Sequence, residues 1–241
     1  MQFEPIQQIR AHEYVAEQIR RYIALRLIKP GEVLPPEREL AALFGVGRPT
    51  VQHALTLLES GRLVESRRGR RGGTVVCQPT EDVEAMEELI TRVLRERAAI
   101  AEMLDFRRVM EPAIAGLAAV TRREDELETL RTAIAGMANA SSEPDYMRND
   151  TEFHIAIARS TRNRFMVDAI EETRLRLNDV ITLLPESDLW HHGISGEHNA
   201  ILKGIESRDG PTAAAAMQVH VANSEQGLRA VLEAVRRRVA G

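Results

Sequence analysis

Residues 37–76 constrain the fold of this chain more than any other stretch. Two short segments with apolar positions at helical spacing flank a tight turn that contains Gly45 and Gly47. Such a pair lets the second helix lie in the major groove of DNA while the first helix braces it. The following residues, 61–76, are rich in arginine and glycine, as expected for a basic hairpin. A sequence-reading DNA-binding protein is therefore the leading hypothesis.

The composition supports a folded chain without a membrane anchor. The 241 residues suffice for one large or two ordinary domains, and 44% hydrophobic residues support a real core. The single Cys77 excludes an intrachain disulfide and a multi-cysteine zinc site. No apolar run approaches the roughly 20 residues that cross a bilayer, and no signal-peptide pattern opens the sequence. The expected compartment is the cytoplasm.

Charge is divided unevenly along the chain. The net charge of -4 would by itself argue weakly against nucleic-acid binding. Residues 1–78, however, carry a balance of +4, and residues 79–241 carry -8. The basic excess coincides with the helix-turn-helix pattern, as in a phosphate-contacting module joined to an acidic partner domain. We therefore expect a DNA-binding domain at 1–78 and a second domain at 79–241.

The first domain has the pattern of three helices and a hairpin. Helical spacing runs over residues 11–28, a second helix begins near Pro36 and closes at Gly45, and a third covers 48–60. Residues 63–66 and 74–77 alternate as two strands. The side chains expected to face the core from the second and third helices are Leu40, Leu43, Phe44, Val51, Ala54, Leu55 and Leu58.

Strand patterns disappear beyond residue 79. Helical periodicity continues almost to the end, with breaks near 97–102, 121–124, 139–145, 160–163, 185–195 and 207–211. This spacing predicts six or seven helices packed as a bundle. The expected fold is mainly α: a winged helix-turn-helix followed by an all-helical bundle.

Several side chains are placed to read DNA. Residues at the start of a recognition helix reach base edges, and arginine pairs with guanine as glutamine does with adenine. Arg38 on the preceding helix can reach phosphate or a base, and the wing tip places arginines around a glycine. The predicted DNA-contacting residues are Arg38, Arg48, Thr50, Gln52, His53, Arg68, Gly69 and Arg70. The alternative is an exposed charged helix and basic loop without this function.

The motifs of this segment resemble the winged helix of the GntR family of bacterial transcription regulators. They are Leu-Pro-Pro-Glu-Arg-Glu-Leu-Ala at 34–41, Val-Gly-Arg at 46–48, and Ala54-Leu55, Leu58-Glu59, Gly61 and Leu63-Val64. This chain has Pro49-Thr50 where the family usually has Thr-Pro, and Gln52-His53 where it usually has Arg-Glu. The resemblance implies DNA binding but does not supply the operator sequence.

A carboxylate and three imidazoles form a candidate metal set. Asp150 and His154 are four residues apart, on one face of a helix, and His198 and His220 lie on later helices. Inside a bundle they can converge on a divalent transition metal such as Zn, Ni, Mn or Fe. From spacing alone, buried histidines that serve only the core remain the alternative, because two of the links are long-range.

Residues 81–238 resemble the FCD-type ligand domain of the FadR subfamily. The marks are Phe106 to Pro112, Asp150-x-x-Phe153-His154, Glu197-His198 and Met217-x-x-His220. The resemblance implies that Asp150, His154, His198 and His220 bind metal, as they do in many members. Other members lack these ligands and bind acyl chains. The resemblance also implies that Arg107 holds an effector carboxylate; the alternative is an ion pair with Glu111 one turn later.

The expected function is a homodimeric regulator, favoured as a repressor, that binds a palindromic operator. A small carboxylate bound at the metal would change its operator affinity. One alternative is the same regulator sensing an acyl-CoA or another non-carboxylate ligand without metal. A metal-dependent hydrolase is disfavoured, because it leaves the DNA-binding half unexplained and no general base stands beside the ligands. The chain is therefore expected not to be an enzyme.

Overall fold

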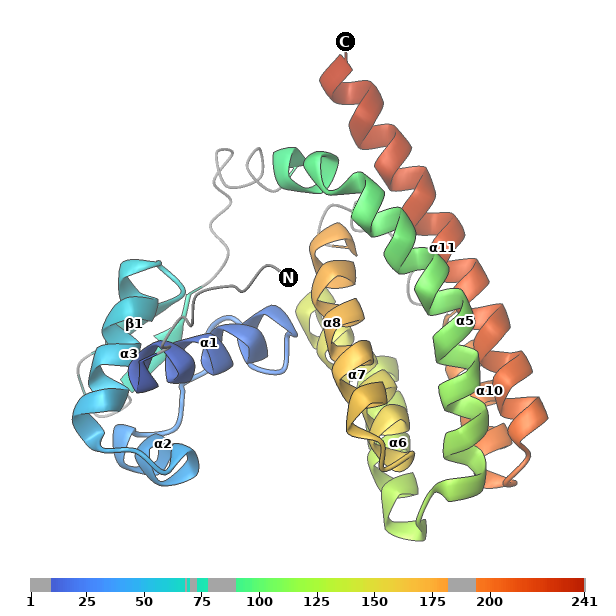
Figure 1. Cartoon of the computed structure of the whole chain (residues 1–241), viewed down its shortest axis with the longest axis horizontal. Coiled ribbons are helices and arrows are strands. Elements are labelled where there is room, and N and C mark those ends of the chain that lie inside the picture. The colour runs from blue at the N-terminus through green and yellow to red at the C-terminus, as the bar shows by residue number, and fades with distance from the viewer. Residues whose placement is uncertain (1–9, 68, 70–72, 78–89, 182–193, 241) are drawn as a thin grey trace, which may run out of the picture. The chain divides into compact units, whose positions relative to one another are not determined.

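The computed structural model describes residues 10–67, 69, 73–77, 90–181 and 194–240. Its contacts divide the chain into two compact units, Met1–Pro79 and Thr80–Gly241 (Figure 1). The described residues of the first unit form helices and a small hairpin, and those of the second form helices alone. No helix among the described residues is long and apolar enough to cross a membrane.

The first unit is a winged helix-turn-helix. It contains α1 (Ala11–Ala24), α2 (Glu37–Phe44), α3 (Arg48–Ser60), β1 (Val64–Arg67) and β2 (Gly73–Val76). Gly45 ends α2 in the left-handed region at φ 65°, where a side chain would be strained, so the chain can turn sharply into α3. The expected stripe of α3 is buried: Val51, Ala54, Leu55 and Leu58. Together with residues of α1 and the strands, it forms the core of the unit.

A third extended segment, which the sequence pattern did not reveal, pairs with the hairpin. The strands are antiparallel, with Val64 opposite Val76. The segment at 31–34 adds to the outer side of β2, because Leu34 N–H donates to the carbonyl of Thr74 and Val76 N–H donates to that of Glu32. These bonds fasten the loop between α1 and α2 to the base of the wing.

Two local expectations in this unit were wrong. The first helix ends at Ala24 rather than near residue 28, and Arg26 takes a left-handed φ of 61°. Leu43 is 74% exposed, whereas Leu40 and Ala41 fill the core position of α2. Phe44 packs against this core as expected, so Leu43 is the one expected core residue of the short helix that lies outside its buried face.

The second unit is a helical bundle, which confirms the expected fold class. Its described helices are α5 (Arg97–Thr121), α6 (Glu124–Ala138), α7 (Glu143–Ser160), α8 (Arg164–Ile181), α10 (Ile194–Glu206) and α11 (Gly210–Ala240). The breaks expected near 121–124, 139–145, 160–163 and 207–211 are helix boundaries. The break expected near 97–102 lies at the start of that range, where a turn at Glu96 separates α5 from the helical residues 90–95; most of the break near 185–195 lies outside the described residues.

Local capping explains why α7 begins where it does. The Ser142 hydroxyl accepts a hydrogen bond from the backbone N–H of Asp145 at 3.3 Å. Glu143 and Asp145 place negative charge in the first turn, where the helix dipole favours it. This start sets the position of Asp150 and His154 further along the helix.

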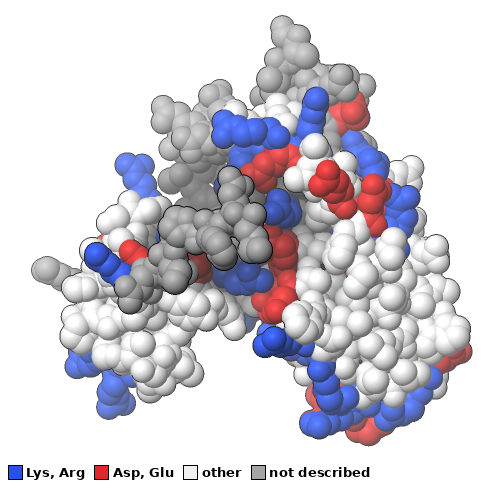
Figure 2. Space-filling view, viewed as in Figure 1, with Lys and Arg blue, Asp and Glu red and all other residues white. Residues whose placement is uncertain are grey.

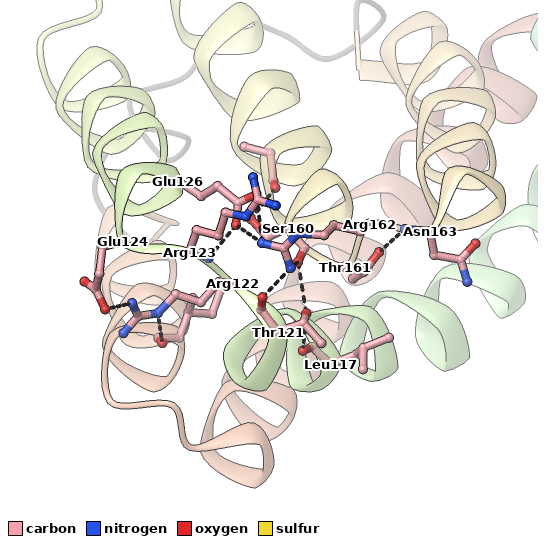
Figure 3. Close-up of polar contacts among 12 residues, drawn as sticks. Leu117, Thr121, Arg122, Arg123, Glu124, Glu126, Ser160, Thr161, Arg162 and Asn163 are labelled. Atoms are coloured by element: carbon pink, nitrogen blue, oxygen red, sulfur yellow. Dashed lines mark hydrogen bonds and ion pairs between the residues drawn. The ribbon is translucent and has the colours of Figure 1, made fainter.

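Arginine side chains join the C-terminal ends of three helices (Figure 3). Arg122 donates to the carbonyl oxygens of Ile205 at 3.2 Å and Glu206 at 2.7 Å, at the end of α10. Arg162, just after α7, donates to the carbonyl of Thr121 at the end of α5 and pairs with Glu126 at 3.2 Å. The last carbonyls of a helix lack partners within that helix. The arginines bind these carbonyls, alongside the backbone N–H of Arg208 that also donates to Ile205, and hold α5, α7 and α10 together.

Candidate functional site

The four predicted metal ligands come together inside the helical unit. Asp150 and His154 lie on α7, His198 on α10 and His220 on α11, and all four are buried. One ligand atom from each lies within 4.8 Å of the others. Donor atoms about 2.1 Å from a shared ion are roughly 3 to 4 Å apart, so small side-chain adjustments would bring these four onto one metal.

One ring nitrogen of His154 is placed as a metal ligand requires. Its Nδ1 lies 2.8 Å from Oε2 of Glu111, which directs the ring. Its Nε2 is buried and has no hydrogen-bond partner among the described residues, and it lies 3.7 Å from Oδ1 of Asp150. A buried nitrogen without a partner is costly in a core histidine but is what a metal ligand requires. A carboxylate behind a metal-binding imidazole is also the usual arrangement of outer-shell partners.

A second carboxylate supports His220. Oε2 of Glu197 lies 3.1 Å from His220 Nδ1, and Asn223 donates to the other carboxylate oxygen. The rings of His198 and His220 are 4.5 Å apart between centroids, and Phe153 packs edge-on against His198 at 5.0 Å. Two of the three imidazoles are thus oriented from outside the cluster, and aromatic packing confines the third.

The protonation states favour metal binding. Burial lowers the pKa of His154, and it lowers that of His220 to about 4. Burial alone would raise the pKa of Asp150, but Arg174 and the neighbouring histidines hold it well below its ordinary range. Burial would also raise the pKa of Glu111, but the neighbouring Arg107 and His154 lower it. At neutral pH, therefore, His154 and His220 are uncharged and Asp150 is ionised, as a divalent ion requires.

Two buried arginines flank this cluster. Arg107 on α5 donates from Nε to Glu111 at 2.5 Å and from Nη1 to Ser224 at 3.3 Å, so the ion pair named as the alternative is present. An effector role for Arg107 stays a prediction. Arg174 on α8 donates to Oδ2 of Asp150 and to Thr151 Oγ1, the latter at 3.3 Å.

Sequence reasoning gave too little weight to three of these residues. The sequence pattern marks Glu111 only as a partner of Arg107, and it assigns no site role to Glu197 or Arg174. A signal for Arg174 exists, because Ile170, Arg174 and Leu177 share the buried face of α8. A charge on an apolar stripe indicates a buried polar partner.

The expected DNA-contacting residues lie on the surface of the winged helix. Arg38, Arg48, Gln52 and His53 are exposed, and Thr50 is half-buried. Glu37 binds two of them: its carboxylate lies 3.5 Å from Arg48 and accepts a hydrogen bond from Gln52 at 3.0 Å. The ring of His53 packs edge-on against His12 of α1.

The wing is described only in part. Gly69 is exposed with a φ of 118°, a conformation that suits glycine. Arg68 and Arg70 lie outside the described residues, so their expected role is neither supported nor contradicted.

A winged helix-turn-helix joined to a helical domain defines a class of DNA-binding protein. Family models agree, since "Bacterial regulatory proteins, gntR family" matches residues 11–76 and "FCD domain" matches residues 102–223. The chain therefore belongs to the GntR family of bacterial transcription regulators and carries an FCD domain, a combination that fits the FadR type. It is a DNA-binding transcriptional regulator and not an enzyme.

Relatives of known role cover most of the chain. The Uxu operon transcriptional regulator of Escherichia coli is 30% identical over 231 residues, 91% of this chain and 87% of that protein. The transcriptional repressor NanR of Cronobacter sakazakii is 30% identical over 90% of this chain and 85% of its own. A GntR regulator structure from Rhodococcus sp. RHA1 matches with a TM-score of 0.50 at 20% identity, covering 91% of this chain and 97% of that one, which supports the fold alone.

Proposed function

We propose that this regulator senses a small carboxylate metabolite through a divalent transition metal held by Asp150, His154, His198 and His220. The observation that carries the proposal is the buried Nε2 of His154, which has no hydrogen-bond partner among the described residues and lies within the cluster. Open coordination positions on such a metal accept an effector carboxylate. The metal would supply Lewis-acid affinity for that carboxylate, and the protein would supply the shape around it.

Control of DNA binding requires that the effector prefer one arrangement of the protein over another. Binding would then change operator affinity by the ratio of the two effector affinities. The proposed direction is repression relieved by the effector. The winged helices of a homodimer would contact the two halves of a palindromic operator through Arg38, Arg48, Thr50, Gln52 and the wing.

An uncharged surface on α5 and α11 is the proposed homodimer interface. Residues 109–120 and 210–224 are all described, and their only acidic or basic side chains, Glu111 and His220, are buried. Val109, Val120 and Val219 are more than half exposed on these segments. Figure 2 shows a broad uncharged surface over the part of the helical unit where Figure 1 draws α5 and α11.

A second copy of this chain fits that surface better than a charged partner does. A two-fold interface brings a patch against itself, so a patch free of charge avoids like-charge opposition. Charged side chains of both signs, including Asp105, Arg108 and Arg229, lie at one border of the patch. Such a border resembles the polar rim of a protein interface.

Elemental analysis combined with a thermal-shift panel of small organic acids tests the sensor. The wild-type protein is expected to hold about one transition metal per chain and to melt at a higher temperature with at least one acid. A His154→Ala/His198→Ala double variant should lose the metal, whereas His12→Ala, in the winged helix, should retain it. Stoichiometric metal in the double variant would refute the site. A metal-free wild type without any acid response would favour the acyl-CoA or other non-carboxylate alternative.

A further inference from the structure

Arg174 is buried beside one of the proposed metal ligands. Only 1% of this residue is exposed, and its Nη2 donates to Oδ2 of Asp150 and to Thr151 Oγ1. A buried guanidinium is costly unless it is paired, and breaking such a pair leaves an uncompensated charge. The link from Arg174 to Asp150 is therefore a fixed part of the packing between α7 and α8.

The two carboxylate oxygens of Asp150 face different partners. Oδ1 lies 3.0 Å from Nε2 of His198 and 3.7 Å from Nε2 of His154, within the cluster. Oδ2 is held by Arg174. Carboxylates bind metal ions through one oxygen or through both. With Oδ2 engaged by the guanidinium, Oδ1 alone is available to the cluster.

We propose that Arg174 is a positioning residue that restricts Asp150 to coordination through one oxygen and so keeps a metal position open for an external ligand. The inference rests on the metal site proposed above. Four protein donors on an ion whose coordination number can rise to six leave room for two more donor atoms, which suffices for a hydroxy acid that chelates; without the acid, the coordination number stays below six. A two-oxygen Asp150 would make five donors and leave only one position.

Nε of Arg174 differs from that of the other buried arginine beside the cluster. Its Nε is buried and has no hydrogen-bond partner among the described residues, whereas Nε of Arg107 is bonded to Glu111. An unpartnered buried donor is costly, so the guanidinium is kept in this position by its bonds to Asp150 and Thr151 rather than by Nε. Arg174 thus combines a fixed bond to Asp150 with a donor that remains unused.

A purely structural ion pair between α7 and α8 gives a different expectation. If Arg174 only stabilises the packing, its replacement lowers stability without changing the ligand geometry of the bound metal. If Arg174 sets the coordination of Asp150, replacement adds an oxygen to the metal. The visible absorption of Co²⁺ distinguishes the two cases, because its intensity falls as the coordination number rises.

The experiment loads the full-length protein with Co²⁺ and compares wild type, Arg174→Met and Arg174→Lys. Absorption spectra report the coordination, and titration calorimetry measures binding of glycolate, the simplest 2-hydroxy acid, to the loaded protein. Circular dichroism verifies folding. Arg174→Gln replaces the Met variant if the latter does not fold, with the same expectation. Saturating Co²⁺ is used, because loss of an outer-shell partner commonly costs about 10- to 100-fold in metal affinity.

The expected result is a Met variant that still binds one Co²⁺, absorbs more weakly, and binds glycolate about tenfold or more weakly. The Lys variant should recover most of the wild-type spectrum, because an ammonium can still hold Oδ2. An unchanged spectrum in the Met variant would overturn the inference, as would a folded Met variant that binds no Co²⁺ at all. A wild type that binds no Co²⁺ would instead refute the metal site itself.

Discussion

Single carboxylates decide what the histidines of the cluster can do. Glu111 lies beside Nδ1 of His154, and Glu197 lies beside Nδ1 of His220. Because a neutral imidazole has one donor and one acceptor nitrogen, an outer carboxylate that accepts the N–H leaves the other nitrogen free to bind a metal. Each of these two histidines therefore depends on its neighbouring glutamate for its role in the site.

The metal-free protein should lose stability as the pH falls from about 6.5 to about 4.5. His220 has a pKa of about 4 in the folded protein, below its ordinary 6.5, because burial disfavours its charged form. In that window the unfolded chain binds the proton and the folded chain does not, so unfolding becomes easier as the pH falls. His154 acts in the same direction. The loss for His220 is about 2 kcal/mol.

Urea unfolding in the presence of a chelator, at several pH values, measures this dependence. Asp150 and Glu111, whose pKa values are also lowered, lose their stabilising contribution only below their ordinary values of 3.8 and 4.5. His220→Gln should therefore flatten the curve between pH 6.5 and 4.5. A wild-type free energy of unfolding that does not change over this range would contradict the prediction.

Arg48→Ala should abolish specific operator binding. Arg48 is exposed at the first turn of α3, and loss of a bidentate arginine contact costs about 1–3 kcal/mol at one base pair, doubled in a two-fold complex. Electrophoretic mobility shifts with operator and with unrelated DNA measure the effect. Arg176→Ala, at a partly exposed arginine of α8, is the control and should bind as wild type does. Unchanged operator affinity in Arg48→Ala would remove α3 from the recognition role.

Helix packing brings the ligands together, and the close approach of α10 to α11 is part of that packing. A methyl group built on Gly204 of α10 would lie 2.5 Å from the backbone nitrogen of Ala213 on α11. Backbone at that distance cannot yield as a flexible side chain can. Glycine at this position therefore allows the approach of the helices that carry His198 and His220.

Gly204→Ala should lower the free energy of unfolding by about 1–3 kcal/mol and weaken metal binding, because α10 must shift away from α11. Gly196→Ala, on the same helix, is the matched control: nothing lies within 4 Å of its added methyl group. That control should be neutral or slightly stabilising, by under about 1 kcal/mol. Chemical unfolding and metal titration measure both variants, and equal behaviour of the two would show that the contact does not limit the packing.

At the scale of the whole molecule, the protein is expected to form a homodimer. Val109→Glu and Val219→Glu each place a charge on the uncharged surface of α5 and α11, where two-fold pairing would bring it near its own copy. Both variants should sediment as monomers in analytical ultracentrifugation and keep their helical content and metal. Phe165→Glu, 70% exposed on α8, is the control and should remain dimeric. Dimeric Val109→Glu and Val219→Glu would place any interface elsewhere.

The sequence by itself determined what depends on local periodicity. A period of 3.6 residues placed Asp150 and His154 on one face of α7, and turn chemistry at Gly45 set the angle between α2 and α3. The helical class of the second unit and the extent of α3 followed from the same rules. The family motifs added the four ligand positions, which spacing left open.

Only the tertiary structure decided which distant side chains meet. His198 lies beside Asp150 although 48 residues separate them, and Arg174 reaches the same carboxylate from α8. The exposure of Leu43 and the pairing of Arg107 with both Glu111 and Ser224 were likewise open in the sequence. Helical periodicity states which face a residue occupies, but the crossing and depth of the helices decide what that face touches.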